Sequence, residues 1–109
     1  MNTFKEASLL RVFVDESDKL DGFPLYENIV LKARKLNLTG ATVIRGIAGF
    51  GAHNLIHSSK ILDMSHNLPV IIEIIDQKEN LEHLLSYLSE VVKEGLITLE
   101  DIKIMNLKR

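Results

Sequence analysis

Three glycines within six residues form the segment of this chain whose chemistry is easiest to interpret. Residues 46–51 read G-I-A-G-F-G and directly follow a β-rich run, ATVIR, at 41–45. Glycine lacks a Cβ, so its backbone can adopt positive φ and bring N–H groups close to a phosphate. The spacing matches neither the dinucleotide-binding pattern G-x-G-x-x-G nor a P-loop. Two interpretations stay open, a phosphate cradle and an ordinary flexible hairpin or bulge.

Basic side chains on both sides of the glycines favour the first interpretation. Arginine, lysine and histidine donate charge-assisted hydrogen bonds to phosphate oxygens. We predict that the backbone of this segment carries a ligand's phosphates, with help from the basic side chains beside it. The predicted contacts in and around the segment are Arg45, Gly46, Gly49, Phe50, Gly51, His57 and Lys60.

Three histidines provide an alternative chemistry. His53 and His57 are four residues apart and could share a helical face, with His66 as a third ligand for a divalent metal. The chain has no cysteine, and no H-E-x-x-H motif accompanies the histidines. Histidine in a loop is more often solvated or hydrogen-bonded, so a metal is not expected.

A single glutamate interrupts the most apolar run of the chain, LPVIIEIID at 68–76. A buried carboxylate without partners costs several kcal/mol, so Glu73 must face a cleft, a basic residue or a subunit boundary. A salt bridge with Arg11, Arg45 or a lysine and a contact with the ligand are both open. Ser58 lacks any cue for a triad or an oxyanion hole, so no enzyme is predicted.

Hydrophobic periodicity predicts the elements that position these residues. Ala7–Val14 alternates with period two, and the β-rich runs 41–45, 68–76 and 97–105 bring the number of predicted strands to four. Residues 15–22, DESDKLDG, are predicted to form a charged, solvated turn region. A first helix begins at Pro24 and ends before Gly40, and a second ends at Gly95. The apolar stripes of the two helices are Leu25, Ile29, Ala33 and Leu36, and Leu81, Leu84, Leu85, Leu88, Val91 and Val92.

Length and charge limit the classes of protein. The 109 residues leave room for a single domain, 1–109, with a long loop at about 46–67. The net charge of −2 provides no positive field for nucleic acid or for an anionic membrane. No apolar stretch reaches the roughly 18–20 residues of a membrane span, and Met1–Glu6 does not resemble a secretory signal. A cytoplasmic protein is expected.

The predicted order is β-α-β-β-α-β, which indicates an α+β, ferredoxin-like fold. In this fold a four-stranded antiparallel sheet carries both helices on one face. Apolar residues occur at both parities of the second and third strands, as in Val43 with Ile44 and Val70 with Ile71. Because one helix layer cannot cover both faces, other copies of the chain are expected on the second face.

Four blocks of sequence, in order, carry a resemblance to a known family. The chain resembles the PII-like family of bacterial and archaeal proteins classed as a domain of unknown function. The blocks are L-R-V-F-V-x-E-S-D-K-x-x-G-x-P-L-Y-E from Leu10, G-A-T-V-I-R-G-I-A-G-F-G-x-x-x-x-I-H from Gly40, L-P-V-I-I-E-I-I-D from Leu68 and E-G-L-I-T-L-E-D from Glu94.

The resemblance implies a homotrimer related to the PII nitrogen-signalling proteins. These bind adenine nucleotides in clefts between subunits and contact partners through a long loop after the second strand. For this chain a protein partner is expected, with a membrane transporter as one candidate. By position, 45–51 resembles the base of that loop, 52–67 its body, and Glu73 the glutamate beside the nucleotide cleft. PII proteins grip the phosphates with a glycine- and lysine-bearing loop, whereas KEGLITLE at 93–100 has one glycine and no lysine after it. AMP or ADP is therefore expected rather than ATP. The alternative is a trimeric divalent-metal-binding protein resembling the cation-tolerance family.

Overall fold

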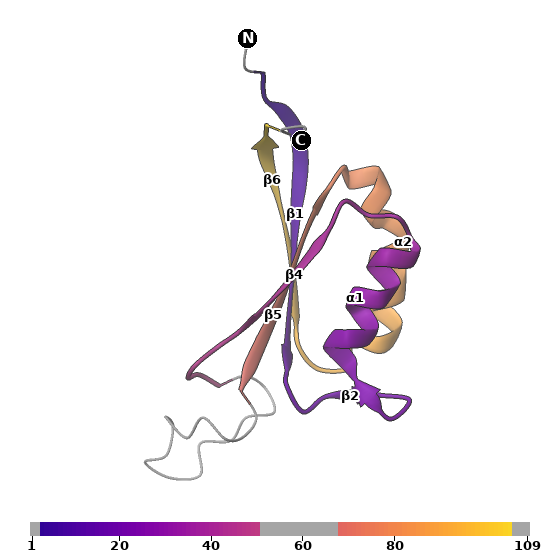
Figure 1. The fold of residues 1–109 in the computed structure, drawn as a ribbon, viewed down its shortest axis with the longest axis vertical. Coiled ribbons are helices and arrows are strands. Elements are labelled where there is room, and N and C mark those ends of the chain that lie inside the picture. The colour runs from indigo at the N-terminus through magenta and orange to yellow at the C-terminus, as the bar shows by residue number, and fades with distance from the viewer. Residues whose placement is uncertain (1–2, 51–67, 106–109) are drawn as a thin grey trace.

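The computed structural model of the protein describes residues 3–50 and 68–105 (Figure 1). One sheet of four strands forms its centre, and two helices lie along one side of it. The elements in chain order are β1 (Lys5–Asp15), β2 (Lys19–Leu20), β3 (Phe23–Pro24), α1 (Leu25–Lys35), β4 (Ala41–Arg45), β5 (Pro69–Asp76), α2 (Lys78–Val91) and β6 (Leu96–Ile104).

The strand order in the sheet is β4-β5-β1-β6, and every neighbouring pair is antiparallel. The central strand β1 pairs with β5 from Ser8 to Asp15 and with β6 from Lys5 to Phe13. This arrangement confirms the predicted α+β fold and its β-α-β-β-α-β order. It also places the two strands that lead to and from the glycine segment, β4 and β5, side by side.

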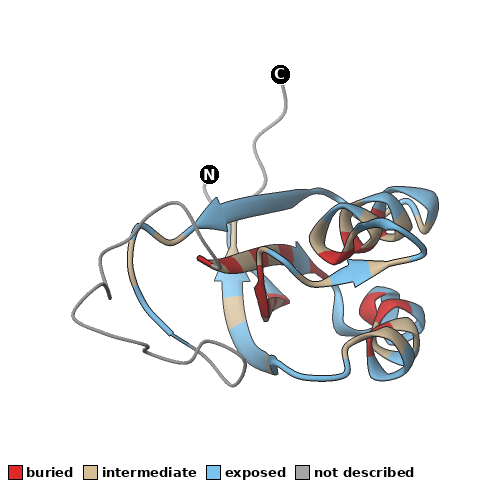
Figure 2. Ribbon diagram, turned by 90° about the horizontal axis from the view of Figure 1, so that it is seen from below, coloured by how far each residue is buried: buried red, intermediate tan, exposed pale blue. Residues whose placement is uncertain are grey.

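Alternation along the strands separates a covered face from an open face. On the covered face Leu10, Val12 and Ile72 are fully buried beneath the helices, because successive side chains of a strand point to opposite sides. Figure 2 shows buried residues on the central strands and on the inward sides of both helices. The helices contribute the predicted stripes, of which Leu25, Ile29, Ala33, Leu81, Leu84 and Leu88 are buried.

The residues that alternate with these along the strands point to the other, open face of the sheet. Phe13 and Ile71 are half-buried there, while Ile44, Ile75 and Leu96 are 42%, 40% and 58% exposed. The described residues place no second layer over this face, as the view in Figure 2 shows. The prediction that the strands at 41–45 and 68–76 carry apolar residues on both faces is confirmed.

The predicted turn region at 15–22 contains more structure than a solvated loop. Strands β2 and β3 form a small hairpin whose turn is Asp21 and Gly22, with φ of 54° and 84°. Asp-Gly is the typical sequence of a two-residue turn that needs positive φ at both positions. Asp15 closes β1, is buried, and accepts hydrogen bonds from the backbone N–H and hydroxyl of Ser17.

The segment after α2 differs from the prediction. The helix ends at Val91, and Gly95 lies beyond it with a φ of 152°. A Cβ on Gly95 would lie 2.5 Å from the carbonyl oxygen of Phe13. Gly95 is therefore required for the close approach of the chain to β1 and does not itself stop the helix.

Asp76 joins three parts of the fold at the end of β5. Its carboxylate is buried and accepts bonds from Thr39 N (2.8 Å), Thr39 Oγ1 (3.0 Å), Gln77 N (2.7 Å) and Asn80 Nδ2 (2.8 Å). Burial by itself would raise the pKa of Asp76, but the hydrogen bonds from Asn80, Thr39 and Gln77 outweigh it and hold the pKa below its ordinary value. The connection before β4 and the start of α2 are thus fixed to the same carboxylate.

Most of the loop predicted at 46–67 lies outside the described residues, which stop at Phe50 and resume at Leu68. Within the described part of the chain, neither helix is both long and apolar enough to cross a bilayer.

Candidate functional site

The glycine segment begins where β4 ends, against the first residue of β5. Gly46 N–H donates to the carbonyl oxygen of Pro69 at 2.8 Å. A Cβ on Gly46 would lie 2.8 Å from Cγ of Pro69, and one on Gly49, at φ 149°, would lie 3.2 Å from it. Both glycines thus allow the backbone to turn closely around the proline ring.

Arg45 lies at the base of this turn and is held by a glutamate that follows β1. Its Nε is 2.9 Å from Oε2 of Glu16, and its Nη2 donates to Oε1 of Glu16 at 3.2 Å. The backbone N–H of Glu16 donates to the carbonyl oxygen of Leu68 at 2.9 Å. The ends of β1 and β4 and the start of β5 therefore meet at one cationic group, whose side chain is 55% exposed.

Apolar side chains accompany the arginine in the described part of the turn. Ile47 is 75% exposed and Phe50 is 64% exposed. An exposed aromatic ring offers a face on which a planar base can stack. A guanidinium, a tight backbone turn and an exposed ring within six residues can together bind an anion that carries an aromatic group.

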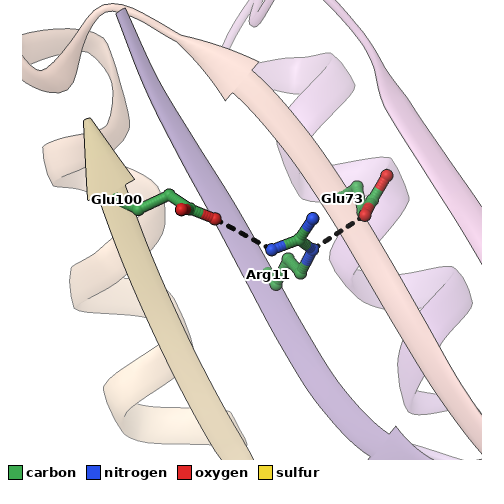
Figure 3. A network of polar contacts seen from close by, with 3 residues as sticks. All are labelled: Arg11, Glu73 and Glu100. Atoms are coloured by element: carbon green, nitrogen blue, oxygen red, sulfur yellow. Dashed lines mark hydrogen bonds and ion pairs between the residues drawn. The ribbon is translucent and has the colours of Figure 1, made fainter. Parts of the chain in front are cut away.

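Glu73 lies in a different environment, on the open face (Figure 3). Arg11 Nε donates to Oε2 of Glu73 at 2.8 Å, and Arg11 Nη1 donates to Oε1 of Glu100 at 2.9 Å. The hydrogen bond to Glu73 is the main reason why the pKa of Arg11 is raised. Of the two interpretations of Glu73, the salt bridge with Arg11 is present in the structure.

The predicted contact residues fall into three groups. Arg45, Gly46, Gly49 and Phe50 share one turn. Glu73 pairs with Thr42, three residues before Arg45, so within one chain the side chains of Glu73 and Arg45 project from opposite faces of the sheet. The rest, Gly51, His57 and Lys60, lie outside the described residues, as do His53 and His66 of the alternative metal site. In the ranges 3–50 and 68–105 no three histidine, aspartate or glutamate side chains are grouped to hold a metal.

Two residues that shape the turn were not predicted as part of it, namely Glu16 and Pro69. Glu16 is 29 positions from Arg45 in sequence, and sequence analysis placed it in a solvated charged loop. The only cue to Glu16 was its place directly after β1, since the strand order brings the end of β1 near that of β4. Pro69 opposes Gly46 through the register of β4 and β5, which local patterns do not specify.

Comparison with solved structures supports the fold. The chain is similar to CPII from Thiomonas intermedia K12, solved bound to ADP and bicarbonate, with a TM-score of 0.71 and 14% identity over 97% of this chain and 95% of that one. It is also similar to a putative PII-like signaling protein from Thermus thermophilus, with a TM-score of 0.66 and 16% identity over 96% and 94% of the two chains. The PII-like fold is thereby shown.

Comparison of sequences identifies the family. A UPF0166 protein of Aquifex aeolicus (strain VF5) is 39% identical over 101 residues, which cover 91% of this chain and 93% of the relative. A UPF0166 protein of Methanocaldococcus jannaschii is 38% identical over 97 residues, or 88% and 89% of the two chains. The model of DUF190, described as uncharacterized ACR, COG1993, matches residues 7–104. This chain therefore belongs to the DUF190 (UPF0166) family, which has a PII-like fold.

Proposed function

We propose that this protein is a cytoplasmic PII-like regulator that binds an adenine nucleotide, AMP or ADP rather than ATP, and has no catalytic turnover. The observation that carries the proposal is the exposed Arg45 beside a tight glycine turn at the end of β4. That turn leads into the loop proposed at 46–67. A relative in fold, CPII, was solved with ADP, which makes this ligand class the first to test.

Each group at the turn has a separate task in this proposal. Arg45 supplies the positive charge and a planar pair of donors for phosphate oxygens. Gly46 donates its N–H to Pro69, so it shapes the turn rather than serving as a phosphate donor. The exposed ring of Phe50 stacks on the adenine. Gly51, His57 and Lys60 remain proposed contacts from the loop, and Glu73 is proposed to reach the same cleft only from a neighbouring subunit.

The open face of the sheet supports the second part of the proposal, a homotrimer with the nucleotide clefts between subunits. Ile44, Ile75 and Leu96 expose large apolar side chains on that face. Exposed apolar surface of this kind commonly marks an interface between protein chains. Nucleotide binding at the loop base then changes the order of the loop, which contacts a protein partner, with a membrane transporter as one candidate.

Mass spectrometry of nucleotide released from freshly purified, denatured protein identifies the resident ligand directly. Calorimetric titration with AMP, ADP and ATP then ranks the affinities. We expect Arg45→Gln to weaken ADP binding at least about tenfold, because a charge-assisted pair of bonds is lost. The matched control is Arg34→Gln, which removes an exposed arginine from α1 and should change affinity less than about twofold. Wild-type protein that binds none of the three nucleotides would refute the proposal.

A second variant tests the shape of the turn. Gly49→Val places a branched side chain at a φ of 149°, against Pro69, and so must reshape the backbone beside Arg45. We expect ADP affinity to fall at least about tenfold, or 1.4 kcal/mol, with the fold intact by circular dichroism. Unchanged affinity would mean that the glycines serve only as a hinge.

A further inference from the structure

We infer that Glu16 competes with the ligand's phosphates for Arg45 and so limits the negative charge that the loop-base site accepts. The inference rests on the proposed nucleotide site and concerns a residue that the proposal does not use. In this inference, the carboxylate of Glu16 causes the proposed preference of the site for AMP or ADP over ATP.

The geometry gives Glu16 the position that a phosphate would need. Its two carboxylate oxygens lie 2.9 Å from Nε and 3.2 Å from Nη2 of Arg45, so the pair is bidentate. A phosphate that binds a guanidinium uses the same planar donors. Glu16 and a phosphate therefore cannot both occupy this edge of Arg45.

The backbone keeps Glu16 nearby even after it is displaced. Its N–H is bonded to the carbonyl oxygen of Leu68, directly before the inner strand β5, whereas Arg45 has a long side chain that is 55% exposed. Exposed ion pairs typically contribute at most about 1 kcal/mol, so an anion can displace the carboxylate. The displaced carboxylate still repels the bound phosphates, and this repulsion grows with each phosphate added.

The opposite role for Glu16 predicts the opposite result. If Glu16 oriented Arg45 for the ligand, its removal would free the arginine and weaken binding. If Glu16 competes, its removal strengthens binding, and more so for the ligand with more phosphates. Whether affinity rises or falls in the variant therefore shows whether Glu16 competes with the ligand or orients Arg45 for it.

The test is calorimetric titration of Glu16→Gln with AMP, ADP and ATP at low salt. We expect ADP to bind about three- to tenfold more tightly than to wild type, with a smaller gain for AMP and a larger one for ATP. The matched control is Glu6→Gln, which makes the same change in net charge at the start of β1. Glu6 lies 3.9 Å from Lys103, on a strand pair remote from Arg45, and its variant should differ from wild type by less than about twofold.

The arms of the experiment separate the two ideas. Wild type that binds ADP together with a Glu16→Gln variant that binds equally or less tightly overturns the inference and leaves the nucleotide site standing. Wild type and variant that both fail to bind any nucleotide overturn both. In the double variant with Arg45→Gln, the gain from Glu16→Gln should shrink, because the competition for Arg45 is gone and only the repulsion between the carboxylate and the phosphates remains. A gain that is just as large without Arg45 would also overturn the inference.

Discussion

The two faces of the sheet each hold an arginine bonded to glutamate, in different surroundings. On the helix side, Arg45 and Glu16 lie at the rim, beyond the buried leucines and isoleucines, where solvent reaches them. On the open face, Arg11 lies between Glu73 and Glu100, on a surface that also exposes Ile44, Ile75 and Leu96. The same chemical pair thus lies where an anion can reach it at the rim, whereas on the open face it links three neighbouring strands of the sheet.

The largest loss of stability is expected from a mutation that creates a cavity on the covered face. Ile72→Ala removes a fully buried side chain from beneath the helices. We expect the free energy of unfolding to fall by about 2–5 kcal/mol, measured by urea denaturation. A loss below about 1 kcal/mol would mean that the covered face is not the main core.

A smaller loss is expected where the covered face ends, at Asp76. Asp76→Asn replaces one acceptor oxygen of this buried side chain with a donor group. Some of the four hydrogen bonds to the carboxylate are then lost, which should cost about 1–3 kcal/mol near neutral pH. The folded pKa lies below the unfolded value of 3.8, so this stabilisation is full above that pH and is lost as pH falls through the folded pKa. The difference between wild type and variant should therefore shrink below about pH 4. A difference that stays constant with pH would contradict the assigned role of the carboxylate.

On the open face the effect should appear in assembly rather than in folding. Arg11→Met leaves Glu73 and Glu100 without their shared cation on the face proposed to be buried between subunits. We expect sedimentation velocity to show dissociation at a concentration at least about tenfold higher than for wild type. Glu100→Gln keeps the bond between Arg11 and Glu73 and should shift assembly less. If wild type and both variants dissociate at the same concentration, the network of Arg11, Glu73 and Glu100 is not part of the interface.

The smallest change in chain stability should come from Ile71→Ala, one residue from Ile72 in the same strand. Ile71 is half-buried on the open face. In protein diluted until it is monomeric, the loss of unfolding free energy should stay within about 1 kcal/mol. At concentrations where copies associate, the variant should lose more, because association stabilises the folded chain. If Ile71→Ala lowers the unfolding free energy of the monomer as much as Ile72→Ala does, the two faces of the sheet do not differ in their contribution to the core.

Patterns along the sequence predict the layers of the fold because each strand and helix carries its own periodicity. Leu10, Val12 and Val14 alternate, and Leu25, Ile29 and Ala33 recur with helical spacing, so their burial follows from local order. The hairpin β2–β3 was missed because each of its strands has two residues, too few for a period. Asp-Gly at 21–22 was the available cue.

The candidate site was predictable only where its residues are consecutive. Arg45, Gly46 and Gly49 were predicted together and do share one turn. Glu73 was assigned to the same cleft, but its face depends on the pairing of β5 with β4, which a one-residue shift would reverse. Contacts between strands distant in sequence, such as that of Glu16 with Arg45, depend on the same pairing.

The central place of β1 also determines when this protein can fold. Its partners β5 and β6 come from the second half of the chain, so the strand synthesised first gains its neighbours last. Contacts between distant residues slow folding, and apolar strands that wait for partners promote aggregation. On the ribosome, Leu10 and Val12 stay unpaired on one side until Leu96–Ile104 has left the exit tunnel. Completion of the sheet therefore has to wait for the synthesis of β6, and chains truncated before β6 should be prone to aggregation.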